Sequence, residues 1–336
     1  MNLGVVLLDI PSARCDSVHV ASEKYEQLRA LLRSYGSCLV AYSGGVDSAF
    51  LAFAAHDVLG DKSLAAIADS PSLPRREFEE ALAVARQFRF PVRVVRTREF
   101  EDASYLANPD NRCYFCKHEL FTELAPLAKA EGLTVIAYGE NASDIGDFRP
   151  GAQAAAEFQV RAPLKEAGLT KADIRTLSAQ LGLPTADKPQ MACLSSRVPY
   201  GEAVTPQKLS MIEQAENVLR DLGFYDVRVR HHELRSSQFR TRSGKPAAAT
   251  PDSALRTPNS GLVLHLARIE VGSAEMRKFL ENGSSIRVAE ALKQIGYAHV
   301  TLDLQGYRRG SANELLRSPE PPGATASPSP SLNRKA

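Results

Sequence analysis

Short apolar runs alternate with longer amphipathic stretches over residues 22–190, and this rhythm indicates alternating strands and helices. Helical spacing of apolar positions occurs at 75–88 and 113–130. The strand-like runs lie at residues 37–42, 64–68, 92–96 and 134–138, with a less regular one at 159–163. This order predicts a mostly parallel sheet with helices on both faces. Ligands of such sheets bind beyond the carboxyl ends of the strands, so the loops that follow the strands are the candidate site.

The pattern changes after about residue 190. Thr205 followed by Pro206 is typical of a helix start, and helical spacing continues to about residue 222. Strand-like runs then occur at 225–231 and 262–271, followed by a helical stretch at 285–295 and a strand-like run at 299–304. The sequence therefore predicts an α/β domain at 22–190 and a smaller α+β domain at 191–315.

Three segments fit neither pattern. Residues 233–261 are rich in Ser, Arg, Pro and Ala without periodicity, which indicates a long insertion in the second domain. The tail at 316–336 is rich in Pro and Ser and cannot bury a core, so it is expected to be disordered. Residues 1–21 form an N-terminal extension to which the pattern assigns no fold.

The segment SGGVDS at 43–48 carries the first chemical signal, because it joins a buried strand to a helix. The adjacent Gly44 and Gly45 let backbone N–H groups approach a ligand, and the helix start presents its positive dipole end to an anion. Ser43 and Ser48 add hydroxyl donors, and Asp47 is a candidate Mg²⁺ ligand. The lack of a following Lys excludes the G-x-x-x-x-G-K-[ST] motif. The segment instead resembles the pyrophosphate loop of the PP-loop ATPases, which implies ATP as a cofactor.

Two further loops follow strands and should lie at the same edge of the sheet. Asp69 and Ser70 follow the second strand, and Gly139 follows the fourth. Because the carboxyl ends of parallel strands share one edge, these residues are expected to complete the nucleotide site.

Cys113 and Cys116 form a C-x-x-C pair at a predicted helix start, which suits a redox dithiol, half of a zinc site or two ligands of an iron–sulfur cluster. The sequence has no second C-x-x-C and no H-x-x-x-H to complete a zinc site. Cys193 is the candidate third ligand, and three thiolates suit a [4Fe–4S] cluster with one open iron. Cys193 is also a candidate nucleophile, because Arg197 lies four residues on and can lower a thiol pKa.

Charge and hydropathy limit the partners. The 336 residues carry 41 Lys and Arg against 39 Asp and Glu, and a net charge of +2 does not favour a nucleic-acid or membrane surface. No apolar run approaches the roughly 20 residues of a membrane span, and the start of the chain lacks a basic segment before its apolar stretch. Five unevenly spaced cysteines are typical of a reducing compartment. We expect a cytoplasmic protein that binds neither nucleic acid nor membrane.

Seven motifs spread over about residues 22–315 resemble the LarE family, the ATP-dependent sulfur transferases of nickel-pincer nucleotide cofactor biosynthesis. They are SGGVDS, NPDNRCYFCK, GENASDIGDFRPG, APLKEAGLTKADIR, DKPQMACLSSRVPYG, LARIEV and VTLDLQGYRRGSANE. The resemblance implies that a carboxylate of pyridinium-3,5-biscarboxylic acid mononucleotide is adenylated and that sulfur then displaces AMP. It also implies a homo-oligomer that works with other proteins of nickel-pincer cofactor biosynthesis.

The resemblance leaves two sulfur sources open. In one branch of the family a cysteine matching Cys193 gives up its own sulfur and becomes dehydroalanine. In another branch two further cysteines join it to hold a [4Fe–4S] cluster with a replaceable sulfide. This sequence has Cys113 and Cys116 as well, so it is more similar to the cluster-containing branch.

The expected substrate is a phosphorylated dicarboxylate, which requires a basic pocket. Arg228 and Arg230 alternate with apolar residues on a predicted strand and so share one face. The family motifs indicate four more substrate-binding residues, which are Arg197, Arg268, Glu270 and Arg308.

Three other functions share parts of this pattern. A PP-loop tRNA thiolase also combines SGGxDS with a C-x-x-C, but it needs a basic RNA surface that a net charge of +2 does not favour. An ammonia-dependent amidotransferase or synthetase shares the loop but does not need the three cysteines together. A nucleotide sensor without catalysis also leaves the cysteines unexplained.

Overall fold

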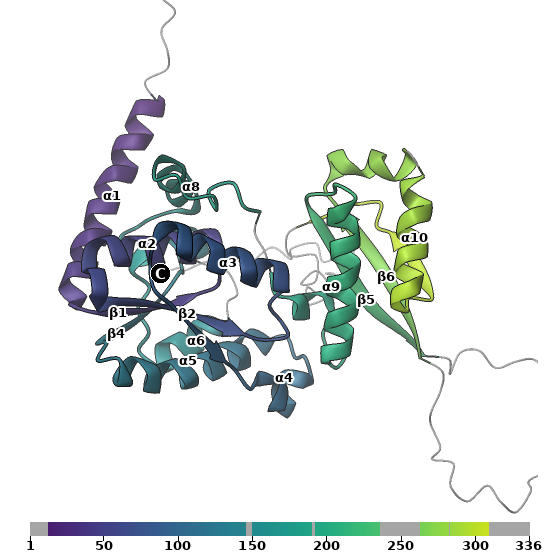
Figure 1. The fold of residues 1–336 in the computed structure, drawn as a ribbon, viewed down its shortest axis with the longest axis horizontal. Coiled ribbons are helices and arrows are strands. Elements are labelled where there is room, and N and C mark those ends of the chain that lie inside the picture. The colour runs from purple at the N-terminus through teal and green to yellow at the C-terminus, as the bar shows by residue number, and fades with distance from the viewer. Residues whose placement is uncertain (1–12, 146–149, 190–191, 236–262, 282, 309–336) are drawn as a thin grey trace, which may run out of the picture.

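The computed structural model describes residues 13–145, 150–189, 192–235, 263–281 and 283–308, with side chains from residue 20 onward. Its first sheet is all parallel with the order β3-β2-β1-β4, which confirms the prediction of a parallel α/β domain (Figure 1). The strands are β1 Cys38–Tyr42, β2 Ser63–Asp69, β3 Val92–Arg96 and β4 Val135–Tyr138. In the register, Val40 of the central β1 lies opposite Ala65 of β2 and Ala137 of β4.

Alternating side chains of β1 build a core on each face of this sheet. Val40 packs into a cluster with α1, α2, α3 and α8, whereas Leu39 packs into a cluster with α5 and α6. Figure 1 shows α2 and α3 on one face and α5 and α6 on the other. The helices are α1 Ala13–Tyr35, α2 Val46–Leu59, α3 Arg75–Phe88, α4 Ala103–Leu106, α5 Arg112–Ala130, α6 Pro150–Glu157, α7 Pro163–Glu166 and α8 Lys171–Gln180. Short 3-10 turns are η1 Gly60–Lys62, η2 Glu99–Glu101 and η3 Ala142–Asp144.

One local prediction differs from the structure. The run at 159–163 forms a single bridge between Arg161 and Ala137 instead of a fifth strand. Its extended segment is short because Val160 N–H closes the end of α6 by donating to Ala155 O, and α7 begins at Pro163. Helix α1 spans residues 21 and 22, and the expected N-terminal extension at 1–21 stays a prediction.

The second sheet has the order β5-β6-β7, with β5 and β6 antiparallel and β6 and β7 parallel. Val229 and Ile269 point into a core with α9 and α10, while Arg228, opposite Glu270, points to the other face. Thr205 accepts a hydrogen bond from Lys208 N–H at the start of α9, as the Thr-Pro pair predicts. The elements are η4 Leu194–Arg197, α9 Pro206–Asp221, β5 Val227–Arg235, β6 Val263–Val271, η6 Ser273–Leu280, α10 Ser284–Ile295 and β7 His299–Leu302.

The segments expected to be irregular fall largely outside the described residues. Strand β5 takes up the first three residues of the expected insertion, 233–235, and the rest of the insertion lies outside the description. The tail at 316–336 also lies outside it. Among the helices that are described, none is both long enough and apolar enough to cross a membrane.

Candidate functional site

The loop between β1 and α2 is held in place by its own hydroxyls. Ser43 N–H donates to Ser48 Oγ at 3.1 Å, and the two serine hydroxyl oxygens are 3.0 Å apart. Gly44 has a φ of +72°, and a Cβ at this position would lie 2.5 Å from Ala81 Cβ on α3. Glycine is therefore required at this turn both for its backbone conformation and for its closeness to α3.

A cavity of about 190 Å³ opens beside this loop, at the carboxyl ends of β1 and β4. The predicted nucleotide residues that line it are Ser43, Gly45, Asp47, Ser48 and Gly139. A larger hollow of about 500 Å³ lies at the opposite end of the sheet, near the start of β3, and contains none of the predicted site residues. The smaller cavity therefore fits the expected phosphate site better than the larger one.

The residues expected after β2 have protein partners of their own. The Asp69 carboxylate accepts a hydrogen bond from Arg75 at 2.6 Å. The Ser70 hydroxyl donates to the buried Glu99 carboxylate, and it accepts from Ser72 N–H at 3.0 Å. Asp69 is the last residue of β2 and Ser70 follows it, and neither residue lines the 190 Å³ cavity.

Asp47 is held by two side chains from the β4 edge of the domain. Lys171 Nζ lies 2.5 Å from Asp47 Oδ2, and Asn141 Nδ2 donates to Asp47 Oδ1 at 3.3 Å. A magnesium ion at Asp47 would take the place of the Lys171 ammonium as the partner of this carboxylate. In the structure, the Lys171 ammonium therefore balances the charge of Asp47, the predicted Mg²⁺ ligand.

Substitution of Gly139 by alanine is expected to displace the nucleotide loop. Its Cβ would lie 2.9 Å from Ser48 N and 3.2 Å from Asp47 Cβ, where backbone has to move. We expect overpacking to lower the free energy of unfolding by about 1–3 kcal/mol. We also expect the Kd for ATP to rise about tenfold for each 1.4 kcal/mol of binding free energy that is lost. Isothermal titration calorimetry measures the binding. The matched control is Gly272→Ala, where the nearest contact would be 3.5 Å; equal ATP affinity in both variants would contradict the expectation.

Cys113 and Cys116 lie in the first turn of α5, and Cys193 directly precedes η4. The pKa of Cys113 is raised by burial and by negative charge on Cys193. The pKa of Cys116 is raised by burial and then by charge on Cys193, Glu99 and Cys113. Cys116 packs against the buried cluster that contains Leu194, and Arg112 donates to Ser195 O at 3.0 Å, so the start of α5 and the Cys193 segment lie next to each other. Within the described ranges, however, no three His, Cys, Asp or Glu side chains are close enough together to hold a single metal ion.

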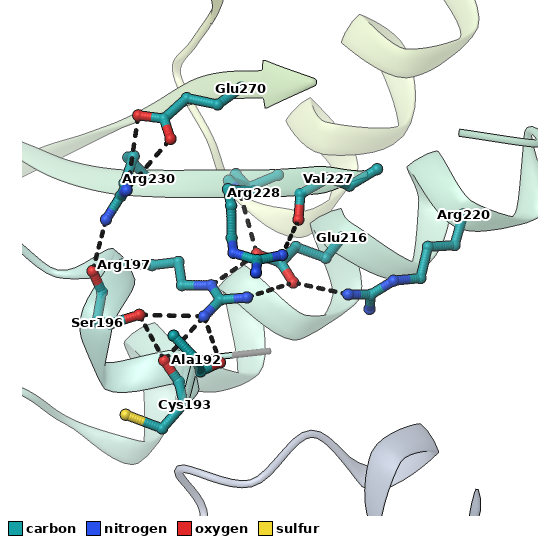
Figure 2. A network of polar contacts seen from close by, with 11 residues as sticks. Ala192, Cys193, Ser196, Arg197, Glu216, Arg220, Val227, Arg228, Arg230 and Glu270 are labelled. Atoms are coloured by element: carbon teal, nitrogen blue, oxygen red, sulfur yellow. Dashed lines mark hydrogen bonds and ion pairs between the residues drawn. The ribbon is translucent and has the colours of Figure 1, made fainter. Parts of the chain in front are cut away.

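Arg197 binds the loop that carries Cys193 rather than facing open solvent, as Figure 2 shows. Its Nη1 donates to the carbonyl oxygens of Ala192 at 2.5 Å and Cys193 at 2.9 Å. Its Nε and Nη2 donate to the two carboxylate oxygens of Glu216 on α9, at 2.8 and 3.2 Å. Burial by itself would raise the pKa of Glu216, but the charge and hydrogen bonds of Arg197 hold that pKa below its usual value.

An arginine-rich face of the second sheet lies next to this loop (Figure 2). Arg230 donates to both oxygens of Glu270, at 3.1 and 3.2 Å, and its Nη1 donates to Ser196 O at 2.7 Å. Arg268 also donates to Glu270, at 3.0 Å, and 38% of its side chain is exposed. Burial and the charge of Arg197 lower the pKa of Arg228.

Arg228 contacts the segment after β7 that also carries Arg308. The Arg228 guanidinium lies 4.8 Å from the centre of the Tyr307 ring, and Arg308 is the next residue along the chain. The structure therefore gathers the predicted substrate residues of the second sheet on one side of it. Arg197 lies beneath the same region as a buried support.

Several residues of this region were not predicted from the sequence. Lys117, next to Cys116 in the chain, lines the 190 Å³ cavity, and its Nζ lies 4.2 Å from the centre of the Tyr138 ring. Lys188 Nζ lies 3.5 Å from Gly44 O. The position of Lys117 next to the predicted ligand Cys116 could have indicated it as a site residue. No local sequence pattern indicates Glu216, the buried partner of Arg197, as part of the site.

Comparison with known proteins shows two relatives over nearly their whole length, while no protein-family model matches. The chain is 40% identical over 293 residues to an uncharacterized protein of Synechocystis sp., covering 87% of this chain and 98% of that protein. It is 31% identical over 294 residues to the pyridinium-3,5-bisthiocarboxylic acid mononucleotide synthase of Lactiplantibacillus plantarum, a match that covers 87% of this chain and 95% of that protein. A shorter match is with the tRNA-specific 2-thiouridylase MnmA of Azorhizobium caulinodans. The two chains are 31% identical over 207 residues, which covers 49% of this chain and 53% of that protein.

Proposed function

The chain belongs to the LarE family, and we propose that it uses ATP to convert a carboxylate of pyridinium-3,5-biscarboxylic acid mononucleotide into a thiocarboxylate. The expected cofactors are ATP and Mg²⁺, bound by the loop at 43–48 with Asp47 as the metal ligand. The product would be a precursor of the nickel-pincer nucleotide cofactor.

One observation supports this proposal most directly: the neighbours of Cys193 bridge the two halves of the site. Leu194 N–H donates to Ser72 O at 2.8 Å, in the loop that follows β2 of the nucleotide-binding domain. Ser196 O accepts from Arg230 at 2.7 Å, on the arginine-rich face of the second sheet. The segment around Cys193 therefore contacts both the loop after β2 and the face on which we expect an anionic substrate to bind.

The proposed reaction has two steps. A carboxylate oxygen of the substrate attacks the α-phosphorus of ATP, and pyrophosphate leaves with the bonding electron pair. The N–H groups and serine hydroxyls at 43–48 stabilise the charge on the phosphates. A sulfur nucleophile then attacks the carboxyl carbon, a C–S bond forms, and AMP leaves with the electrons of the broken C–O bond.

The source of that sulfur is proposed from the three cysteines. Thiolates are soft ligands that suit an iron–sulfur cluster. Cys113, Cys116 and Cys193 would be its ligands, because charge on Cys193 acts on both other thiols. The described residues hold no compact set of three His, Cys, Asp or Glu side chains, so the proposal of a cluster rests on the family resemblance and on the chemistry of these three thiols. When bound, the cluster would supply a replaceable sulfide and so permit repeated turnover.

Cys193 itself is the alternative sulfur donor. Its thiol would attack the adenylate and form a thioester. Removal of its Cα proton would then break the Cβ–S bond, so that the sulfur leaves with the electron pair as the thiocarboxylate and residue 193 becomes dehydroalanine. Such a protein would act once.

The function is tested by incubating anaerobically purified protein with ATP, Mg²⁺ and pyridinium-3,5-biscarboxylic acid mononucleotide. We expect substrate-dependent AMP and pyrophosphate, together with a product in which sulfur replaces one oxygen, detected by mass spectrometry. AMP formation that requires ammonia, or thiolation of tRNA in place of the mononucleotide, would overturn the proposal in favour of the corresponding alternative.

The sulfur source is tested by Cys113→Ala. We expect this variant to lose the iron and acid-labile sulfide of the wild-type protein, and to make at most one thiocarboxylate per chain. The control is Cys38→Ala, which removes a thiol buried in β1, where burial raises its pKa to about 12. Equal iron content and repeated turnover in wild type and Cys113→Ala would exclude the cluster as the source.

A further inference from the structure

Three buried hydroxyls meet where the two domains touch. The Ser72 hydroxyl oxygen lies 2.6 Å from Tyr105 Oη and 2.7 Å from Ser195 Oγ, and the last two are 2.8 Å apart. The residues are 4%, 1% and 0% exposed, and they come from the loop after β2, from α4 and from η4. A hydroxyl both donates and accepts, so a closed ring of three satisfies each member without water.

The ring sits against apolar side chains. Tyr105 belongs to a buried cluster with Leu194, Val198, Leu209 and Ile212. Apolar side chains in place of the three hydroxyls would have filled this space without the free-energy cost of removing hydroxyl groups from water. A fully satisfied polar group inside an apolar cluster instead specifies one geometry, because any shift leaves a hydroxyl unpaired.

The backbone around the ring ties it to Cys193. Ser72 O accepts from Leu194 N–H at 2.8 Å, one residue from Cys193. Ser72 N–H donates to Ser70 Oγ at 3.0 Å. Both backbone polar groups of Ser72, its N–H and its C=O, are therefore hydrogen-bonded. The ring therefore links the position of Cys193 to the loop after β2.

A second link joins the ring to the C-x-x-C helix. Arg112, which directly precedes Cys113, donates from Nη1 to Ser195 O at 3.0 Å and also to the Asn108 side chain. Asn108 Nδ2 donates to Pro199 O at 2.6 Å, further along the Cys193 loop. Ser195 is thus held through its hydroxyl on one side and through its carbonyl on the other.

We propose that the Ser72–Tyr105–Ser195 hydroxyl ring is a latch that positions Cys193 between the loop after β2 and the C-x-x-C helix. The inference rests on the proposed function, because the latch matters to activity when Cys193 takes part in sulfur transfer. Tyr105 is a positioning residue: it touches neither expected substrate, and it acts on Cys193 through Ser195 and Ser72.

The test compares Tyr105→Phe with wild type in two measurements. First, substrate-dependent AMP formation should stay near the wild-type rate, with an unchanged KM for ATP, whereas thiocarboxylate formation falls roughly ten- to hundredfold because Cys193 is misplaced. Secondly, the rate at which iodoacetamide alkylates Cys193, relative to Cys113 in the same metal-free chain, should change several-fold. The matched control is Tyr114→Phe, whose hydroxyl bonds Glu157 on the surface at 2.9 Å.

Unchanged transfer and an unchanged alkylation ratio in Tyr105→Phe would overturn the latch. If wild type makes no thiocarboxylate, the proposed function fails, and the alkylation ratio still decides whether the ring positions Cys193. Ser195→Ala opens the same ring and replaces Tyr105→Phe in both measurements if that variant does not fold. In the double variant Ser72→Ala/Ser195→Ala the loss should be much smaller than the sum of the two single losses, since one opened ring cannot be opened again; additive losses would contradict a ring.

Discussion

Replacement of Cys193 by alanine is expected to abolish thiocarboxylate formation while AMP and pyrophosphate still form. Both proposed sulfur sources pass through this residue, either as the sulfur donor or as a cluster ligand. Adenylation should persist, because the loop at 43–48 and the Asp47–Lys171 pair lie on the first domain and do not depend on the thiol. Mass spectrometry of the product and a phosphate-release assay for pyrophosphate measure the two steps separately.

The same reaction distinguishes the two roles of Cys193. Loss of the mass of H₂S from the intact wild-type chain after one turnover would identify Cys193 as the donor, whereas an unchanged chain mass with iron retained would favour the cluster. The control is Cys38→Ala, which should keep both steps. Sulfur transfer that survives in Cys193→Ala would remove this residue from the mechanism.

The parts of the fold that depend on local pattern could be predicted from the sequence. Strand β3 has the predicted bounds, and α3 begins and ends where the spacing of apolar positions indicates. The loop at 43–48 was recognisable because two glycines, two hydroxyls and a carboxylate lie within six residues between a strand and a helix. By contrast, the run at 159–163 has strand-like residues but lies between two helix ends, and tertiary hydrogen bonding decided its structure.

The parts of the site that depend on distant contacts could not be predicted. Ser72 and Ser195 are 123 positions apart, and although Ser195 lies in the motif DKPQMACLSSRVPYG, no spacing in the sequence pairs it with Ser72. The family motif CLSSR indicates Arg197 as a substrate-binding residue, and that role stays a prediction. The structure shows Arg197 fully buried against Glu216 and two carbonyl groups. Its burial follows from the packing of η4 on α9, which no spacing in the sequence reveals.

Replacement of Glu216 by glutamine is expected to destabilise the second domain by about 3–5 kcal/mol, because it leaves the Arg197 charge buried without its partner. The carboxylate also accepts from Val229 N–H at 3.1 Å and from Arg220 at 3.2 Å, so α9, β5 and η4 all depend on it. Denaturant unfolding measures the loss. Glu290→Gln on the exposed side of α10 is the control and should change stability by no more than about 0.5 kcal/mol.

The pH dependence of this loss has a definite sign. The pKa of Glu216 is lowered in the folded chain, against the burial that would raise it. Its charge therefore stabilises the fold above the pKa of an unfolded glutamate, and this contribution disappears as the pH falls through the folded value. The stability difference between wild type and Glu216→Gln should be full at pH 7 and should shrink in acid; a difference that grows in acid would contradict the assignment.

A double replacement separates what the Glu216–Arg197 pair contributes to stability from what it contributes to the site. Exchanging both residues for apolar ones, as in Arg197→Met/Glu216→Leu, removes both buried charges, and stability should recover relative to Glu216→Gln. Sulfur transfer should not recover, because Ala192 O and Cys193 O both lose the Arg197 donor, and the remaining donors to Cys193 O, Ser196 N–H and Oγ, lie on the same loop and do not tie it to α9. A double variant that is stable and fully active would show that the pair supports the fold alone. A stable variant with adenylation but without transfer would identify Arg197 as the residue that orients the Cys193 loop.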